Sequence, residues 1–210
     1  MNKLSAFLSI LILPILTMTA VAETAKSVTV EIPIFSQKVR FSLPDGWKNN
    51  KAKQFKQSFL AEFTPVDEEL ESWTNLFALQ AHQNFDPTIS PEQVSDSYAA
   101  GFVKLCPKSV IYSKLKTQLI DGHQAYLSLM GCANMPVDTV SGLKKGMSEI
   151  SFYIFVKGTK DLYIFQKSLR GDGFDPENLP ASIKQSVNEM KSFSPMQFCN
   201  LDSPKGKCLK

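Results

Sequence analysis

Apolar and polar residues alternate along the chain just after its N-terminal segment. Two alternating runs occupy residues 27–44 and are separated by a polar turn at residues 36–38. Side chains two residues apart share one face of a strand, so this pattern predicts a β-hairpin. Further strands are predicted at residues 58–64, where Pro65 ends the run, and at residues 76–83.

A helical period replaces the alternation at residues 90–105. Ser90, Pro91 and Gln93 supply an N-cap, a proline at the first helical position and the closing residue of a capping box. The apolar stripe of this predicted helix consists of Val94, Tyr98, Phe102 and Leu105. A second helix, opened at residues 175–180, is predicted from a stripe formed by Leu179, Ile183, Val187 and Met190.

Two more hairpins are expected in the second half of the chain. Residues 110–119 and 124–132 flank Asp121-Gly122-His123, and residues 149–157 and 162–170 flank a turn at 158–161. The last two strands are apolar on both faces, which indicates central strands covered on both sides. With a short acidic helix at residues 67–69, these elements predict an α+β fold, in which helices cover both faces of a mostly antiparallel sheet as an α/β/α sandwich.

The N-terminal segment has the features of a signal peptide. One lysine precedes a short apolar stretch, and Ala20-Val21-Ala22 forms a small-x-small cleavage pattern. We expect a signal peptide at residues 1–22, cleavage between Ala22 and Glu23, and a periplasmic or extracellular product. An uncleaved membrane anchor is the alternative, although Pro14 and the short apolar core disfavour it. No later run is long enough to span a membrane as a helix.

Four cysteines follow, an even number that indicates two disulfides in an exported chain. Three pairings are possible, and Cys106–Cys132 with Cys199–Cys208 is the one favoured. A zinc site is the weaker alternative, because the chain has no C-x-x-C spacing and only two histidines. We expect one α+β domain at residues 23–198 and a disulfide-closed tail at residues 199–210.

Three short segments carry a resemblance to a known family. They are Phe-Ser-Leu-Pro-Asp-Gly-Trp at residues 41–47, Ala-Glu-Phe-Thr-Pro at 61–65 and Leu-Glu-Ser-Trp-Thr at 70–74. Together with the order of elements, they resemble small exported bacterial proteins with the PsbP-like fold, named after an extrinsic photosystem II subunit. The resemblance covers about residues 39–193 and implies a mostly non-enzymatic protein that binds other proteins. The family supplies no active-site residues to transfer, and the tail departs from its simplest members.

Charge and motifs exclude several functions. The net charge is +3, and the densest basic stretch, Lys48 to Lys56, is interpreted as a solvated loop, so nucleic acid is not an expected partner. The chain lacks a G-x-S-x-G elbow, a P-loop, a dinucleotide fingerprint and an H-E-x-x-H motif. His82, with Asp86 nearby, is the candidate general base, but an ordinary strand histidine is the favoured interpretation. His123 lies in a predicted turn.

Other residues leave weaker alternatives open. The acidic residues at 67–71 are interpreted as a solvated helix start, with calcium binding as the alternative. Arg170-Gly171-Asp172 is the integrin tripeptide on a predicted exposed loop, and chance is its favoured explanation. Trp47 and Trp73 are expected core anchors that could instead mark a partner surface.

The sequence thus favours an exported, non-catalytic protein that binds another protein or a cell-envelope component. No catalytic residue, metal or cofactor is expected, and the oligomeric state is left open. Two alternatives stand beside this hypothesis. One is a small-ligand carrier with a pocket between the sheet and the helix at residues 90–105, and the other is an atypical hydrolase near His82.

Overall fold

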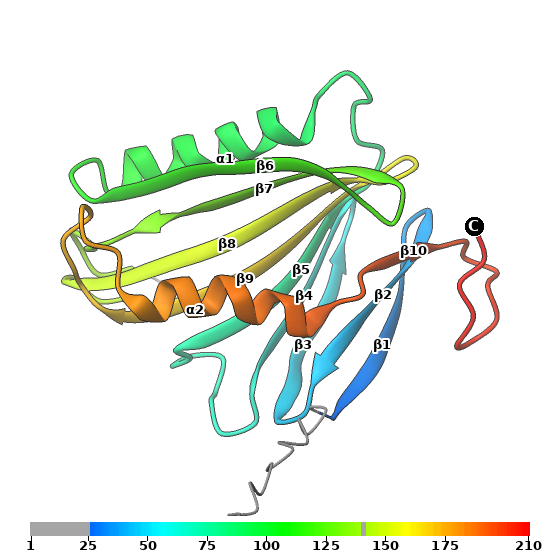
Figure 1. Cartoon of the computed structure of the whole chain (residues 1–210), viewed down its shortest axis with the longest axis horizontal. Helices are drawn as coiled ribbons and strands as arrows, with labels where there is room; N and C mark the ends of the chain where they lie inside the picture. The colour runs from blue at the N-terminus through cyan, green and yellow to red at the C-terminus, as the bar shows by residue number, and fades with distance from the viewer. Residues whose placement is uncertain (1–25, 140–141) are drawn as a thin grey trace, which may run out of the picture.

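Two antiparallel sheets and two helices make up the part of the chain that the computed structural model describes, which is residues 26–139 and 142–210 (Figure 1). The expected signal peptide at residues 1–22 and the cleavage site at Ala22 and Glu23 lie outside these residues. No helix in the described ranges is long and apolar enough to cross a membrane.

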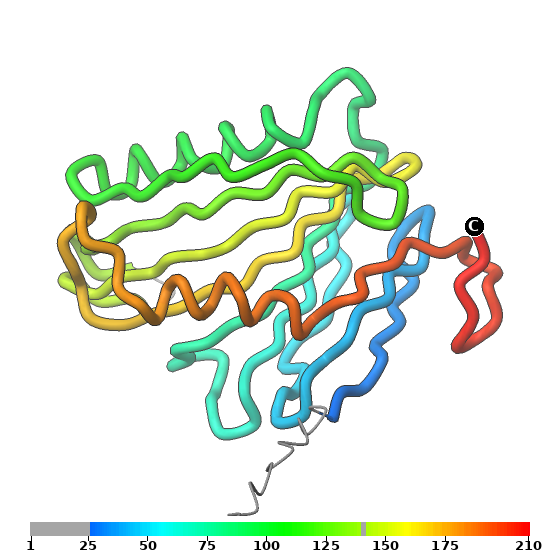
Figure 2. Tube along the Cα trace, in the orientation of Figure 1, coloured from blue at the N-terminus to red at the C-terminus, as the bar shows by residue number. Residues whose placement is uncertain are grey.

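The smaller sheet joins the two ends of the described chain. It has three strands in the order β1-β2-β10, namely β1 (Ser27–Ile34), β2 (Gln37–Pro44) and β10 (Gln197–Cys199). Val39 of β2 lies opposite Phe198 of β10, and both side chains are buried. Figure 2 shows the C-terminal segment running back beside this N-terminal hairpin.

The larger sheet has seven strands, each antiparallel to its neighbours. Their spatial order is β3 (Trp47–Phe55), β4 (Ser58–Pro65), β5 (Asn75–His82), β9 (Leu162–Asp172), β8 (Met147–Lys157), β7 (His123–Cys132) and β6 (Val110–Ile120). The expected position of the two-faced apolar strands is correct, because β8 and β9 lie in the interior of the sheet and are buried along most of their length.

One face of the large sheet carries the helix α1 (Pro91–Leu105). The expected capping box is present, since Ser90 accepts from the Gln93 amide while the Gln93 side chain accepts from the Ser90 amide. The helix packs over β6, β7 and β8, where Val94 and Ala99 contact Met130, Tyr153 and Phe155 among other residues. Its footprint leaves β3, β4 and β5 bare on this face.

The opposite face of the large sheet forms the main core, and both helical segments and the small sheet cover it. The helix α2 (Ala181–Glu189) and the 3₁₀ helix η1 (Met190–Phe193) contribute Ile183, Met190 and Phe193, and the small sheet contributes Val39 and Phe41. The expected antiparallel α+β fold is therefore correct. The expected covering by helices is incomplete, because α1 lies over only part of one face and α2 shares the other face with η1 and the small sheet. Alternation along residues 27–44 indicates a hairpin without revealing whether that hairpin joins the large sheet or packs on it as a second one.

Other local predictions need correction. Lys48, Lys51 and Lys53 belong to the edge strand β3 rather than to a loop. The sequence did not reveal this strand, because an edge strand exposed on both faces shows no apolar alternation. Residues 67–69 are not helical, and α2 begins at Ala181 rather than near residue 175. The short strand β10 has too few residues to give a periodic signal.

The four cysteines lie in the two favoured pairs. Cys106–Cys132 joins the C-cap of α1 to the end of β7, with the two Cα atoms 5.9 Å apart. Cys199–Cys208 links β10 to the C-terminal tail, with a Cα separation of 4.9 Å. The tail is also held by Lys38, which donates to the Ser203 carbonyl, so covalent and polar contacts replace the apolar residues that this segment lacks.

Candidate binding groove

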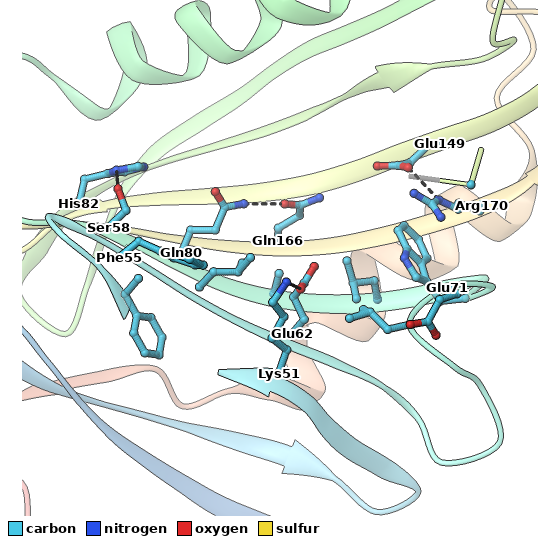
Figure 3. Close-up of a pocket in the computed structure, with 17 residues that line it drawn as sticks. Lys51, Phe55, Ser58, Glu62, Glu71, Gln80, His82, Glu149, Gln166 and Arg170 are labelled. Atoms are coloured by element: carbon cyan, nitrogen blue, oxygen red, sulfur yellow. Dashed lines mark hydrogen bonds and ion pairs between the residues drawn. The ribbon is translucent and has the colours of Figure 1, made fainter. Parts of the chain in front are cut away.

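An open groove lies on the part of the large sheet that α1 does not cover. It has a volume of about 790 Å³ and is lined mainly by side chains of β3, β4, β5 and β9 (Figure 3). Strand alternation explains its composition. In β5, Phe77, Leu79 and Ala81 point into the main core, whereas the residues between them form the floor of the groove.

His82 and Ser58 stand at one end of the groove (Figure 3). The two residues are directly opposite in the β4–β5 pairing, and Ser58 Oγ lies 3.3 Å from His82 Nδ1. Burial lowers the pKa of His82 below its ordinary value, so the imidazole is neutral at pH 7. The side chain of Asp86 instead bonds to Thr88, and no described residue gives His82 a carboxylate partner. The general-base alternative for His82 therefore has no support from Asp86.

Two glutamines form the middle of the floor. Gln166 Nε2 donates to Ser168 Oγ at 2.7 Å and to Ser151 Oγ at 3.3 Å, so both of its amide hydrogens are used. Its Oε1 accepts from Gln80 Nε2 at 3.0 Å, and Tyr98 donates its hydroxyl to Gln80 Oε1 at 3.5 Å. These bonds fix the orientation of the Gln80 carboxamide.

Gln80 keeps unused hydrogen-bonding capacity. A carboxamide has two N–H donors and two acceptor lone pairs, and the bonds to Gln166 and Tyr98 use one of each. The remaining N–H and lone pair have no partner among the described residues, and the side chain is partly exposed. The floor therefore offers one donor and one acceptor side by side, which is the complement of a peptide group.

Arg170, Glu149 and Trp73 form the opposite end of the groove. The Arg170 guanidinium carbon lies 3.7 Å from the centroid of the Trp73 ring, and Arg170 Nε donates to Glu149 Oε2 at 2.8 Å. Trp73 packs on Leu76, Ala78 and Leu60. This stack makes a rigid apolar wall with a charged rim.

The remaining rim comes from β3 and the loop before β5. Lys51 Nζ lies 3.9 Å from the Glu62 carboxylate. The Phe55 side chain is 47% exposed, and Lys53 Nζ lies 4.3 Å from the centroid of the Phe55 ring. Glu71 lines the same end of the groove as Arg170 (Figure 3). Charges of both signs surround a floor of amides and small apolar side chains, an arrangement suited to a protein segment of mixed polarity.

The structure separates the two tryptophans. Trp73 lies in the groove, whereas Trp47 packs against Phe193 at 5.1 Å between ring centroids on the main-core face of the sheet. His123 is also remote from the groove, since its ring contacts Phe198 of the small sheet at 5.1 Å. Burial lowers the pKa of His123.

The tripeptide at residues 170–172 and the acidic residues at 67–71 make structural contacts within the fold. The tripeptide Arg170-Gly171-Asp172 lies within β9 and pairs with β8 rather than forming an exposed loop, and Arg170 is held by Glu149 and Trp73. The Glu68 carboxylate accepts from the amides of Thr74 and Asn75, and the Glu69 carboxylate pairs with Lys48. Among the described residues, no group of three His, Cys, Asp or Glu side chains gathers as a metal site would require.

Sequence patterns gave no direct indication of Gln80, Gln166 or Glu149 as site residues. The available signal was the alternation in the strand at residues 76–83, where polar Gln80 and His82 fall on the face opposite Phe77 and Leu79. A polar stripe on a strand is ordinarily solvent-facing. Its role as a groove floor depends on which neighbours lie beside it and on how far α1 extends, and neither follows from local sequence.

Comparisons with known proteins identify the fold. No protein-family model and no curated protein matches the chain. The solution structure of cyanobacterial PsbP (CyanoP) from Synechocystis sp. PCC 6803 matches 85% of this chain and 98% of its own, with a TM-score of 0.50 and 11% sequence identity. The chain therefore has a PsbP-like fold, as its sequence resemblance indicates.

Two structures of Mog1 are also similar. The crystal structure of the Ran-binding protein Mog1p from Saccharomyces cerevisiae covers 85% of this chain and 97% of its own, with a TM-score of 0.49 and 10% identity. A point mutant of protein Mog1 covers 83% and 97%, with a TM-score of 0.47 and 10% identity. At such identities the similarity concerns the fold alone.

Proposed function

We propose that this chain is an exported, non-catalytic binding domain that receives an extended segment of a partner protein in the groove beside α1. The observation that carries the proposal is the unused N–H and lone pair of Gln80, held in place by Gln166 and Tyr98 on the floor of the groove. A peptide group in an extended segment presents one carbonyl and one N–H and would satisfy both.

The surroundings of Gln80 favour the same occupant. Leu60, Ala78 and Leu76 provide apolar contacts along the floor, and the Trp73–Arg170 stack provides a rigid aromatic wall at one end. Tryptophan and arginine are frequent at the energetic centres of protein interfaces. A volume of about 790 Å³ leaves room for several residues of a bound segment.

Binding of selected peptides tests the proposal. Random dodecapeptides are selected on the purified protein, and the affinity of the best binders is measured for the wild type, Gln80→Leu and Gln124→Leu. Gln80→Leu keeps the size of the side chain and removes its polar atoms, so we expect at least about a tenfold loss of affinity. Gln124 is exposed on β7, outside the groove, and its variant serves as the matched control.

Three outcomes oppose the proposal. Peptides that bind Gln80→Leu as tightly as the wild type would place the occupant elsewhere. Failure to select any saturable binder would remove the peptide occupant altogether. Sedimentation with purified cell-wall polymer that is lost in Gln80→Leu would identify an envelope component, and not a protein, as the partner.

Export is supported by the small-x-small pattern at Ala22 and by the two cysteine pairs, since disulfides persist in oxidising compartments. We expect the chain recovered from the producing cell to begin at Glu23 and to carry no free thiol. N-terminal sequencing and mass spectrometry with a thiol-alkylating reagent check both points. A chain that retains residues 1–22 would contradict export by cleavage.

A second candidate, an atypical hydrolase, has one supporting contact, the 3.3 Å separation of Ser58 Oγ and His82 Nδ1. Activated serines in hydrolases depend on a histidine that a third group orients, and no described residue supplies a carboxylate to His82. We therefore expect hydrolysis of p-nitrophenyl acetate to be unchanged in Ser58→Ala. A loss in both Ser58→Ala and His82→Ala would promote this candidate.

A further inference from the structure

A second hollow lies on the other face of the large sheet, between the edge strand β6 and the α2–η1 segment. Its volume is about 530 Å³. Leu127, Phe152 and Ile154, from β7 and β8, form its floor, and Val187 and Met190 line it from the helical side. We call this hollow the β6–α2 groove. It lies on the opposite face of the sheet from the groove of Gln80 and Trp73, which is called the peptide groove below.

The β6–α2 groove lies beside the edge strand β6, where the small sheet and η1 no longer cover the large sheet. The small sheet and η1 cover the middle of the main core, and β6 has no further strand on its outer side. The floor residues are at most 7% exposed, yet they line the hollow directly. Met190 and Met196 add flexible side chains that adapt to an apolar occupant.

The charges around the groove have one sign. Lys114, Lys116 and Lys191 line it, and the described lining contains no Asp or Glu. The Lys114 ammonium group is paired with Glu92 and Asp96 of α1, on the other face of the sheet. Lys116 and Lys191 form no ion pair with any described residue.

The strand register places Lys116 on the groove side. Lys116 lies directly opposite Leu127, a floor residue, so both side chains project from the same face of the sheet. A bulge between Lys114 and Lys116 produces this arrangement, because it leaves Lys114 toward α1 and Lys116 toward α2. Lys191 reaches the groove from η1. An apolar floor thus lies between two cations that lack partners.

We propose that the β6–α2 groove binds a free single-chain anionic amphiphile, a long-chain carboxylate, with its alkyl chain on the floor and its carboxylate between Lys116 and Lys191. The alkyl chain matches the apolar floor, and the head group supplies the negative charge that the lining lacks. A neutral apolar molecule would leave both lysines without a counter-charge. A volume of about 530 Å³ lies within the range of small-molecule sites.

Calorimetric titration with laurate below its micelle concentration tests the proposal. We expect saturable binding of one laurate per chain, and at least about a tenfold weaker affinity in the double variant Lys116→Gln/Lys191→Gln. The matched control is Lys205→Gln/Lys207→Gln, which removes two exposed lysines of the tail without touching the groove. Thermal unfolding of both variants checks that the fold is kept.

Changes to the ligand test the proposal without altering the protein. Shortening the chain from laurate to decanoate removes two methylene groups, and we expect affinity to fall about tenfold if the chain is buried. Dodecanol keeps the chain and loses the charge, so it should bind wild type and the double glutamine variant with the same, weaker affinity.

Several results would overturn the proposal. They are the absence of saturable laurate binding, equal affinity for laurate and dodecanol, or an unchanged affinity in Lys116→Gln/Lys191→Gln. Co-sedimentation with phosphatidylglycerol vesicles that depends on the two lysines, without binding of free laurate, would assign the lysines to a membrane surface instead. None of these outcomes bears on Gln80, so the fate of this groove is independent of the peptide groove.

Discussion

Gly131 shows how a single residue sets the spacing of the central strands. It lies in β7 at a φ of +156°, and a Cβ atom added there would overlap the carbonyl oxygen of Glu149 in β8. Glu149 is also the residue that holds Arg170 at the end of the peptide groove. The missing side chain therefore allows the backbone approach on which one wall of that groove depends.

Gly131→Ala should lower the free energy of unfolding by about 1–3 kcal/mol, because backbone atoms of β8 must shift to admit the methyl group. Gly101→Ala is the matched control. Gly101 lies in α1 with open space around it, and its substitution should raise stability by up to about 1 kcal/mol. Urea unfolding of the two variants measures both effects, and a neutral Gly131→Ala would show that the two strands can separate at no cost.

Single residues were the least predictable part of the site. His82 and Trp73 could be singled out from the sequence because histidine and tryptophan carry distinctive chemistry, and both line the groove. Gln80 could not, since its significance comes from two neighbours, Gln166 and Tyr98, that are distant in the chain. Outside the groove, buried Lys167 was equally hidden, because its partners Asn75 and Glu189 come from other elements of the fold.

At the scale of elements, α1 determines which part of the large sheet stays open. Its start is set by the capping box at Ser90 and Gln93, and its end is tied to β7 by Cys106–Cys132. A helix with both ends fixed covers a defined area of sheet. The peptide groove is the area of the same face that it leaves free.

Ser90→Ala removes the side chain that caps the Gln93 amide and should cost about 1 kcal/mol of stability. Ser97 is an exposed serine within the same helix. Ser97→Ala should be neutral or slightly stabilising, because alanine has the higher helix propensity. Thermal unfolding of the two variants separates the cap from a general effect of losing a serine, and equal results would show that the cap contributes nothing.

Elements with a strong local signal were predicted well, and those without one were missed. The hairpins at Asp121-Gly122 and at residues 158–161 combine turn residues with apolar strands, so they could be placed from sequence. The strand β3 could not, because its alternation is lost where both faces meet solvent. The division into two sheets also escaped prediction, since strand pairing between distant segments leaves no local periodicity.

Across the whole molecule, folding shifts the pKa values of the tyrosines in the same direction. All five have a raised pKa. For Tyr112, burial and the hydrogen bond to Asp96 raise the pKa to about 12, and burial is the main cause for Tyr153 and Tyr163. Burial lowers the pKa of Lys167. Its effect on the pH dependence of stability is opposite to that of the tyrosines, but it comes from one group against five.

The free energy of unfolding should therefore fall as the pH rises above about 10. Unfolded tyrosines lose their protons near pH 10, whereas the folded chain retains them, so the folded state binds more protons and stability declines with pH. Urea unfolding at pH 9 and pH 11 measures the decline, and Tyr153→Phe should reduce it by at most about 1.4 kcal/mol per pH unit. Stability that stays constant over this range would contradict the burial of these hydroxyls.

The pairing of β2 with β10 has a consequence for the order of events during synthesis. Phe193, Met196 and Phe198 complete a core whose other members include Val39 and Phe41. The ribosome makes a chain from its N-terminus at about 5–20 residues per second, so the first hairpin waits for almost the entire polypeptide before its last partner emerges. The core therefore stays incomplete until β10 has been made, and an incompletely folded chain is the form that the export proposed above requires.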